Sequence, residues 1–401
     1  MSNQSAHRFR SLPMPLAIRP IARIMDRLNF GELEIAYKQS SWFFRGVSPN
    51  HLSSDMEIFN PLGLLWKGLT RGDIGFAESF MAGDWGSSDL PDLLELFAAN
   101  EKYLNRRYRN SSWRNLFTHR FNMNSSRGSR CNIAYHYDLG NAFYDLWLDR
   151  TMSYSAASFD DPLASLERAQ QRKYEQLLDR LEASPEQDLL EIGCGWGGLA
   201  EVAAKRGHRI DGITLSREQL GYARNRLSEQ GLSDLARFDY LDYRSISRQY
   251  DHIVSIEMFE AVGERYWPAF FDVINKALRP GGRAALQLIT IDESYFESYR
   301  DNADFIQLYV FPGGMLPSLT RFREHAIRAG FRLLDSSLNA SDYTRTLQLW
   351  SERFETVYDE IRELGFDERF IRMWRYYLAY CEAGFKAGRV DLARITLEKI
   401  A

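Results

Sequence analysis

The sequence is poor in cysteine, and its three cysteines stand far apart, at Cys131, Cys194 and Cys381. This spacing argues against a disulfide framework or a cysteine-rich metal site, and it favours a reducing cytoplasm. Long apolar runs are also missing, since no stretch reaches the roughly 18 residues of a membrane-spanning helix. The first 25 residues lack the long apolar core of a signal peptide. We therefore expect a cytoplasmic protein without a membrane span.

Acidic residues are missing from one stretch of the chain. No Asp or Glu occurs at 102–130, where eight lysines and arginines fall, although the formal net charge of the whole chain is −4. That overall charge excludes a general attraction to nucleic acid. The composition of 101–130 predicts a basic linker at a domain boundary. Together with Leu64, Leu65 and Trp66 it is a candidate for membrane contact; a solvated linker and a buried core helix are the alternatives.

Two folded parts are expected on either side of this linker. After a lead-in at 1–27, residues 28–100 predict an N-terminal accessory α+β domain. Its strand-like runs cover 33–37, 42–45 and 56–60, and its helical patterns cover 61–69 and 90–99. Residues 131–401 form the second predicted domain.

In this second domain strands and helices alternate, which is typical of a parallel sheet with helices on both faces. The predicted strands lie at 188–192, 209–213, 235–239, 251–256 and 283–290. The predicted helices lie at 163–183, 197–206, 217–230 and 266–278, and Arg279-Pro280-Gly281-Gly282 predicts a helix end and a turn. Further strands are predicted at 331–338 and 347–350, and 351–388 reads as helical. The fold class is therefore α/β.

The most informative stretch is 189–200, where an apolar run ends in glycines at 193, 195, 197 and 198. Glycines let the backbone turn tightly and let a ligand lie against bare main chain, facing the amides that open the next helix. The Gly-x-Gly-x-x-Gly spacing alone is a weak indicator of nucleotide binding. Trp196 is unusual in a dinucleotide loop, and the pattern is similar to motif I of S-adenosylmethionine-dependent methyltransferases. A tight strand-to-helix turn of any α/β protein is the alternative.

Polar residues follow the next two strands at their carboxyl ends, where α/β folds bind ligands. Thr214 and Gln219 offer neutral hydrogen bonds to a ribose. An acid followed by an aromatic residue, Asp242 and Tyr243, suits an adenine ring. The alternatives are a helix N-cap at Ser216 and an ordinary polar loop.

The fourth strand runs into Glu257 and Glu260. Two carboxylates alone make a poor metal site. An acid near a sulfonium could instead stabilise positive charge that develops on a substrate.

Polar aromatic residues are dense at 135–144 and 151–155, just ahead of the glycine loop. This density is too high for a plain linker. A capping element that packs on the sheet is the alternative to a ligand-binding segment.

In their order along the chain, these motifs resemble the cyclopropane fatty acid synthase family, which includes mycolic acid cyclopropane synthases and methyltransferases. The resemblance covers about 28–400. The matching motifs are the run from Gly72 to Trp85, His136-Tyr137-Asp138, Tyr154-Ser155, the glycine loop, Thr214-Leu215-Ser216, Phe259-Glu260-x-Val262-Gly263, the run from Phe311 to Pro317, and Tyr343 before Thr346-Leu347-x-Leu349-Trp350.

The resemblance implies a Rossmann-like class I methyltransferase fold for 131–401. It implies that a one-carbon unit passes from S-adenosylmethionine to the double bond of an unsaturated acyl chain, usually in a phospholipid. The cofactor would be held by Tyr154, Ser155, Gly193, Gly195, Thr214, Gln219, Asp242 and Tyr243. Glu260, Tyr343 and the backbone near Ile291 would hold a bicarbonate that acts as base, with His136 nearby. The resemblance also implies peripheral contact with the inner face of the membrane, and a homodimer.

Two positions depart from the family pattern. Ala156 stands where the family usually has cysteine, and Ile289 stands where it usually has histidine. Two side chains of the implied anion cage are therefore missing. We predict a cyclopropane product first, with a methyl-branched or methylene chain as the alternative.

Two other classes of protein remain as alternatives. The intact glycine loop, Glu260 and Tyr343 argue against a non-catalytic lipid-binding protein with a degenerate nucleotide fold. The unit at 28–100 argues against a small-molecule methyltransferase, because simple methyl transfer does not need it.

Overall fold

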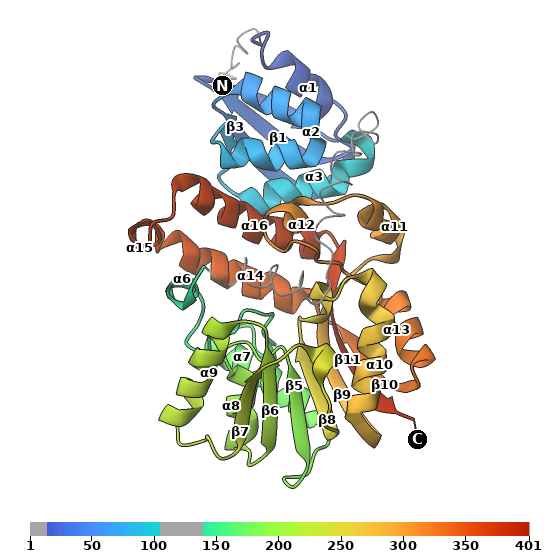
Figure 1. Cartoon of the computed structure of the whole chain (residues 1–401). Helices are drawn as coiled ribbons and strands as arrows, with labels where there is room; N and C mark the ends of the chain where they lie inside the picture. Colours follow the sequence, from blue (N-terminus) through green and yellow to red (C-terminus); the bar gives the residue numbers. More distant parts are fainter. Residues whose placement is uncertain (1–13, 105–138, 401) are drawn as a thin grey trace, which may run out of the picture. The chain divides into compact units, whose positions relative to one another are not determined.

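A computed structural model describes residues 14–104 and 139–400 of the chain (Figure 1). The packing divides these residues into two compact units. The first contains 14–104 together with Glu368–Ala383, and the second contains 139–367 and 384–400. A helical segment late in the sequence therefore belongs to the first unit, an addition that the predicted boundaries do not include. None of the described helices is long and apolar enough to cross a membrane.

The first unit is a small sheet with helices. Its strands are β1 (Phe30–Tyr37), β2 (Ser40–Arg45), β3 (Ser48–Ile58) and β4 (Trp85–Gly86), in the order β2-β1-β3-β4. Its helices are α1 (Arg19–Met25), α2 (Pro61–Met81), α3 (Leu90–Leu104) and most of α16 (Glu368–Lys386). Strand β1 is antiparallel to β2 and parallel to β3. Alternation along β1 places Leu33 and Ile35 in the core of this unit.

Helix α2 has a sharp kink at Gly72, whose φ is +56°. The two halves of the helix touch just after the kink. A Cβ atom on Gly75 would stand 1.9 Å from the carbonyl oxygen of Lys67, so only glycine permits this approach. The Lys67 ammonium in turn lies 2.5 Å from the Asp84 carboxylate. Several residues of the motif at 72–85 thus shape the first unit.

The second unit contains a seven-stranded sheet in the order β10-β11-β9-β8-β5-β6-β7. Strands β5 (Asp188–Ile192), β6 (Arg209–Thr214), β7 (Ala236–Tyr240), β8 (Tyr250–Ile256) and β9 (Leu278–Ile291) are parallel to their neighbours. Strands β10 (Phe331–Leu338) and β11 (Val390–Lys399) extend the sheet with antiparallel pairings. This arrangement confirms the predicted α/β fold.

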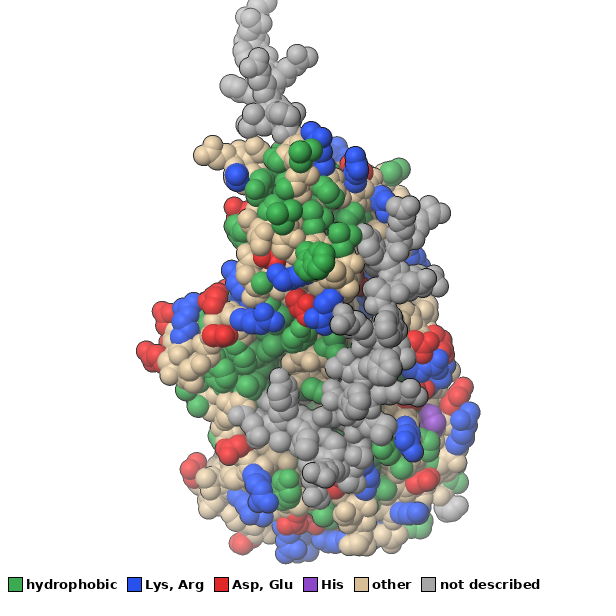
Figure 2. Space-filling model, turned by 45° about the horizontal axis from the view of Figure 1, so that its top comes forward, with side chains coloured by type: hydrophobic (Ala, Val, Ile, Leu, Met, Phe, Trp, Pro, Cys, Tyr) green, Lys and Arg blue, Asp and Glu red, His purple; other side chains and the backbone are tan. Residues whose placement is uncertain are grey.

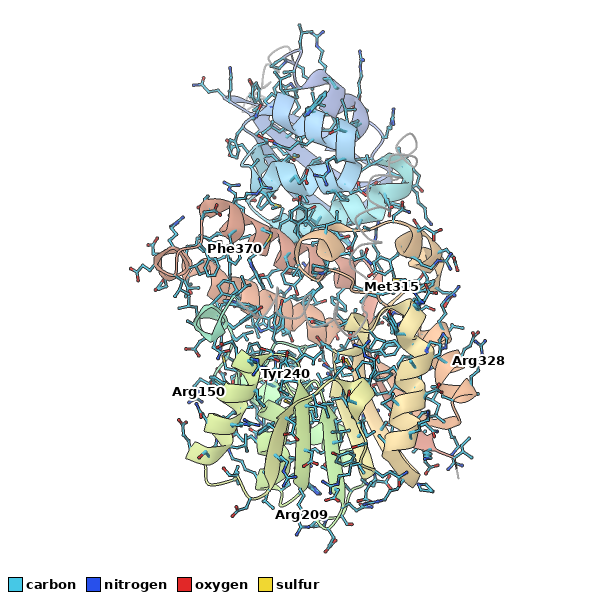
Figure 3. All side chains as sticks on the ribbon, in the orientation of Figure 1. Arg150, Arg209, Tyr240, Met315, Arg328 and Phe370 are labelled. Atoms are coloured by element: carbon cyan, nitrogen blue, oxygen red, sulfur yellow. The ribbon has the colours of Figure 1, made fainter. Side chains whose placement is uncertain are left out.

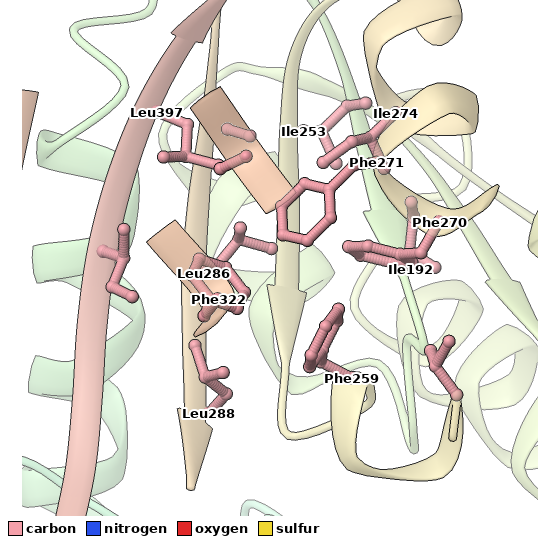
Figure 4. Close-up of a cluster of buried hydrophobic side chains, with 14 of the residues drawn as sticks. Ile192, Ile253, Phe259, Phe270, Phe271, Ile274, Leu286, Leu288, Phe322 and Leu397 are labelled. Atoms are coloured by element: carbon pink, nitrogen blue, oxygen red, sulfur yellow. The ribbon is translucent and has the colours of Figure 1, made fainter. Parts of the chain in front are cut away.

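Helices cover both faces of this sheet. Buried side chains of α7 (Leu166–Asp179), α8 (Gly198–Lys205) and α9 (Arg217–Glu229) form one cluster with the strands. Those of α10 (Trp267–Ala277) and α13 (Leu319–Arg328) form another on the opposite face (Figure 4). Phe259, which lies between Glu257 and Glu260 in the sequence, is buried in this second cluster. The core therefore anchors the segment that carries both acids.

Five other α-helices of this unit lie in the part of the chain that the structure describes. They are α6 (Asn141–Trp147), α11 (Glu293–Asp301), α12 (Phe305–Tyr309), α14 (Ala340–Glu355) and α15 (Tyr358–Glu363).

One predicted strand is wrong. Residues 347–350 lie inside helix α14, where Tyr343, Leu347, Trp350 and Phe354 are buried at steps of three and four residues. That spacing is helical, and it becomes visible only when the window extends beyond the predicted strand on both sides.

Two strands, β9 and β11, also differ from the prediction. Helix α10 ends at Ala277 as expected, but 279–282 begin strand β9 instead of forming a separate turn. Strand β11 was not predicted at all. It is buried between β9 and β10, so its sequence lacks the simple alternation of a half-exposed strand.

Candidate active site

The predicted site residues of the second unit gather at one edge of its sheet. Strands β8, β5, β6 and β7 are parallel neighbours, so their carboxyl ends meet at the same edge. Figure 3 labels Tyr240 at this edge, at the end of β7, and Arg209 at the opposite edge, at the start of β6. Gly193, Thr214, Asp242 and Glu257 each stand at or just beyond one of these strand ends.

The glycine loop is a turn of bare main chain. Gly193, Gly195 and Gly197 have φ values of +85°, +51° and +82°, a region that favours glycine. The backbone N–H groups of Gly193 and Cys194 both donate to the Ile213 carbonyl, which ties the loop to β6. A Cβ on Gly195 would meet nothing within 4 Å. The loop therefore offers open space beside exposed backbone, as a cofactor requires.

The glycine loop also abuts the two acids. Met258 lies between them in the sequence, and a Cβ on Gly193 would stand 3.1 Å from the Met258 side chain. The loop and the Glu257–Glu260 segment are therefore parts of one site.

The end of β6 forms a small buried polar group. The Thr214 hydroxyl donates to Oε1 of Gln219 at 3.0 Å, and the Ser216 hydroxyl accepts from the Gln219 backbone N–H at 3.2 Å. The N-cap at Ser216 is therefore confirmed, and the Gln219 side chain still points back to the strand end. Asp211, earlier in β6, instead accepts hydrogen bonds from Arg248 and Tyr250.

The loop after β7 holds a buried ion pair. The Asp242 carboxylate binds the Arg244 guanidinium at 2.6 and 2.8 Å and also accepts from the Arg244 backbone N–H. Tyr243 packs against Phe270, and burial raises the pKa of its phenol to about 12. The Asp242 carboxylate is thus fixed in place by Arg244.

The aromatic segment before α7 packs against the glycine loop. The Trp196 indole N–H donates to Asn141 at 2.7 Å, and its ring lies 5.2 Å from that of Tyr144. Tyr144 also contacts Tyr154, whose ring lies 5.4 Å away. The segment is therefore a packed element, and through Tyr144 it connects Tyr154 to Trp196 of the loop. His136 lies outside the described residues.

Beside this segment a lysine is completely buried. The Lys173 ammonium donates to the Ser155 hydroxyl and to Gln170, both at 2.6 Å. Burial lowers the pKa of Lys173 to about 7, and the nearby Glu257 carboxylate opposes that shift. The sequence did not predict this buried lysine, because a lysine on a mostly polar helix is expected to be exposed to solvent.

Glu257 is the unexpected centre of the site. Its Oε1 accepts from the Ala156 backbone N–H and from the Gln287 side-chain amide, both at 2.9 Å. Its Oε2 accepts from the Tyr343 hydroxyl at 2.7 Å. Tyr343, a predicted catalytic residue, therefore forms its hydrogen bond with Glu257. The sequence had shown only that two acids end this strand.

Glu260 lies deeper, against β9. Its Oε1 accepts from the Ile289 backbone N–H at 2.5 Å, and its buried Oε2 has no hydrogen-bond partner among the described residues. Burial first, and the Glu257 carboxylate second, raise the pKa of Glu260 to about 8. Burial and the neighbouring Glu257 carboxylate therefore favour the protonated form of Glu260 at neutral pH.

The described residues do not fit the bicarbonate that the resemblance implies. The Tyr343 hydroxyl already donates to Glu257, and the Ile291 backbone N–H donates to the Pro317 carbonyl at 3.0 Å. Ala156 and Ile289 have no polar side-chain atoms. A free anion here would also be repelled by the buried Glu257 carboxylate.

A buried arginine on strand β11, Arg394, contacts one of the residues that bind Glu257. Arg394 donates through Nε to Gln287 at 2.9 Å and through a terminal nitrogen to the Ala157 carbonyl at 2.9 Å. It also lies 3.1 Å from the Asp342 carboxylate. Arg394 therefore fixes the Gln287 amide that holds Glu257. Its strand was not predicted, so neither was this role.

Comparison with known proteins shows the family of the chain. The family model described as mycolic acid cyclopropane synthetase matches residues 124–395. The chain is 42% identical to tuberculostearic acid methyltransferase UfaA1 of Mycobacterium tuberculosis, over 96% of this chain and 92% of the relative. It is 32% identical to the cyclopropane-fatty-acyl-phospholipid synthase of Escherichia coli K12, over 86% of this chain and 88% of the relative.

Solved structures of two cyclopropane synthases are also similar to this chain. The cyclopropane synthase MmaA2 from Mycobacterium tuberculosis superposes with a TM-score of 0.64 at 30% identity, covering 67% of this chain and 98% of that one. The mycolic acid cyclopropane synthase CmaA1, solved with SAH and CTAB, has the same TM-score at 29% identity, covering 67% and 98%.

Fold and site thus define a class I S-adenosylmethionine-dependent methyltransferase with a Rossmann-like fold. More particularly, the chain belongs to the mycolic acid cyclopropane synthetase family, whose members act on lipid acyl chains.

We expect Arg394→Met to lower the free energy of unfolding by about 3–5 kcal/mol, because it leaves a buried carboxylate at Asp342 without its cation. Urea unfolding of the full chain measures this change. The control is Arg332→Met, which removes an exposed ion pair with Glu398 on the neighbouring strand and should cost about 0–1 kcal/mol. Equal losses in the two variants would contradict a supporting role for Arg394.

Proposed function

We propose that the protein transfers a one-carbon unit from S-adenosylmethionine to the double bond of an unsaturated acyl chain in a phospholipid. The observation that carries this proposal is the meeting of the bare glycine loop, at one sheet edge, with two acids whose pKa values are raised by burial. An alkene is a weak nucleophile, so its methylation needs a dry site and a fixed approach. Buried acids beside a cofactor loop suit that demand.

The residues at this edge fit the cofactor. Gly193 and Gly195 would accept it against main chain, and the buried Thr214 and Gln219 would bind its ribose. Asp242 and Tyr243 would bind the adenine, and Tyr154 with Ser155 would close the site from the aromatic segment. When bound, the cofactor supplies a methyl group on a positively charged sulfur.

Aromatic rings near the acids suit a cationic intermediate on the acyl chain. Methyl transfer to one alkene carbon leaves positive charge on the other. The Tyr154 ring lies 5.4 Å from that of Trp350 and 6.4 Å from that of Phe311. Their π faces would stabilise this charge without adding a nucleophile that could trap it.

We propose a methylene-bearing open chain as the product, ahead of the ring. Ala156 and Ile289 remove two of the anion-holding side chains that the family usually has, and a relative at 42% identity is named a methyltransferase. A 1,2-hydride shift that moves the positive charge onto the methylated carbon, followed by loss of a proton from the transferred carbon, balances this reaction without a further reactant. A saturated branch would need a separate hydride donor. Ring closure is the second candidate, supported by the E. coli synthase at 32% identity.

Incubation with labelled S-adenosylmethionine and vesicles of unsaturated phospholipid tests the proposal. Proton NMR of the product lipid should show the two protons of an exocyclic methylene and no cyclopropane ring protons. Vesicles with saturated chains are the control and should take up no label. Ring protons in the product would show that cyclopropanation is the function. Saturable binding of the cofactor without turnover would indicate a lipid-binding protein that is not an enzyme.

We expect Gly195→Ala to raise the dissociation constant for S-adenosylmethionine about tenfold. A side chain at φ +51° costs about 1–2 kcal/mol, so in the free protein the loop would shift away from the conformation that binds the cofactor, and binding would have to restore it. Gly221→Ala is the matched control, because Gly221 also has open space but lies in helix α9 with no left-handed φ. Isothermal titration measures both variants, and equal affinities would remove the glycine loop from the cofactor site.

Contact with the membrane would involve helix α2 of the first unit. Leu62, Trp66 and Leu69 are exposed at helical spacing, whereas Leu64 is buried, so the core-helix alternative holds for Leu64. Figure 2 shows apolar side chains gathered on this unit, with lysines and arginines among them. A phospholipid surface fits such a mixture, because the apolar side chains enter the headgroup region and the cations meet anionic lipids.

We expect Trp66→Ser to weaken binding to anionic phospholipid vesicles about tenfold or more, since burial of a large apolar side chain contributes about 1.5–3 kcal/mol. Vesicle sedimentation measures the effect. Leu163→Ser is the control: Leu163 is 91% exposed, more than Trp66 at 71%, but lies in the second unit. An unchanged affinity of the Trp66 variant would argue against this surface.

A further inference from the structure

A carboxylate of the chain itself occupies the centre of the site. Glu257 is partly buried, and donors from three separate segments converge on it: the Ala156 backbone, the Gln287 side chain on β9 and the Tyr343 hydroxyl on α14. Such convergence fixes the position of both carboxylate oxygens. A side chain held this firmly is preorganised for a reaction at a defined place.

The backbone at this position is also unusual. Glu257 has φ +49°, in the region that favours glycine, and its N–H donates to the Gln287 carbonyl at 2.7 Å. Non-glycine residues in this region are uncommon, and they cluster at functional sites where the surrounding structure holds them. The strained backbone aims the side chain at Tyr343 and Ala156.

The contacts of Glu257 differ from those of a structural ion pair. Its three donors are an amide N–H, a side-chain amide and a phenol, which are all neutral. Within the described part of the chain no lysine or arginine forms an ion pair with it; Lys173 and Arg394 act on it only through longer-range attraction. A buried carboxylate without a direct cation remains available to take up a proton.

We infer that the Glu257 carboxylate is the base that takes the proton from the transferred carbon, in place of a bound bicarbonate. This inference rests on the proposed function. Methyl transfer forms one C–C bond and leaves a cation on the neighbouring alkene carbon. Glu257 then accepts one proton from the new methyl group, and the released C–H electron pair forms the third ring bond. For the methylene product, a 1,2-hydride shift first moves the positive charge onto the methylated carbon, and the same electron pair then forms the double bond. The proton stays on Glu257 until solvent removes it.

The electrostatics around Glu257 suit this role. Burial raises the pKa of its carboxyl group, while the Tyr343 hydroxyl and the buried Lys173 oppose that shift. Arg394 also attracts its charge. The result is a stronger base than an exposed glutamate. Activity should therefore fall as the pH drops through the raised pKa of Glu257, because the protonated acid cannot accept a proton.

Replacement by an isosteric amide tests the base directly. We expect Glu257→Gln to lower the turnover of unsaturated phospholipid by about 10²–10⁴-fold, as for loss of a general base. Its affinity for S-adenosylhomocysteine should stay within about threefold of the wild type, which shows that the cofactor site is intact. The control is Glu78→Gln: Glu78 is a buried glutamate that pairs with Arg71 in the first unit, and this variant should keep full turnover.

Dependence on bicarbonate gives a second, independent readout. Wild-type turnover should be unchanged in buffer freed of carbon dioxide and bicarbonate. Glu257→Gly, which removes the carboxylate and relaxes the φ +49° backbone, should be inactive there and should regain turnover when bicarbonate or formate is added. Rescue by a small anion is not expected if Glu257 only supports the fold.

Each outcome either supports or rejects Glu257 as the base. If wild-type turnover is lost without bicarbonate, or if Glu257→Gln turns over within about threefold of the wild type, Glu257 is not the base. If a Glu257 variant no longer binds S-adenosylhomocysteine, the wild-type bicarbonate measurement still decides. Absence of any wild-type turnover with unsaturated phospholipid would instead reject the proposed function, which is a separate result.

Discussion

The site depends on a carboxylate that is buried without a cation in direct contact. Glu257 keeps its place because neutral donors from three segments converge on it. Burying a charge in this way is costly unless hydrogen bonds satisfy it, so all three donors must be in position together. The segment before α7, strand β9 and helix α14 are therefore coupled through one side chain.

That coupling extends into the scaffold. Arg394 comes from the last strand, and it holds both Gln287 and the Asp342 carboxylate at the start of α14. The antiparallel extension of the sheet is thus connected to the site by hydrogen bonds as well as by packing. On the other side, the glycine loop touches Met258, so the cofactor end and the acid end share one short segment.

The two acids of this segment affect each other's ionisation. Burial raises the pKa of both, and the proximity of Glu257 favours the protonated form of Glu260. Two neighbouring carboxyl groups in a dry site seldom ionise together. This explains how two glutamates three residues apart can differ in protonation at the same pH.

The sequence by itself determined the α/β fold, the glycine loop and the N-cap at Ser216, because each depends on local spacing and local backbone geometry. It misassigned 347–350, where a short window cannot separate a strand from a buried helix face. It noted Glu257 only as one of two acids. Only the tertiary structure decided that Glu257 meets Tyr343 and Gln287, since these residues come from elements distant in sequence. A hydrogen bond forms between neighbours in space, and local pattern carries no information about which distant side chains become neighbours.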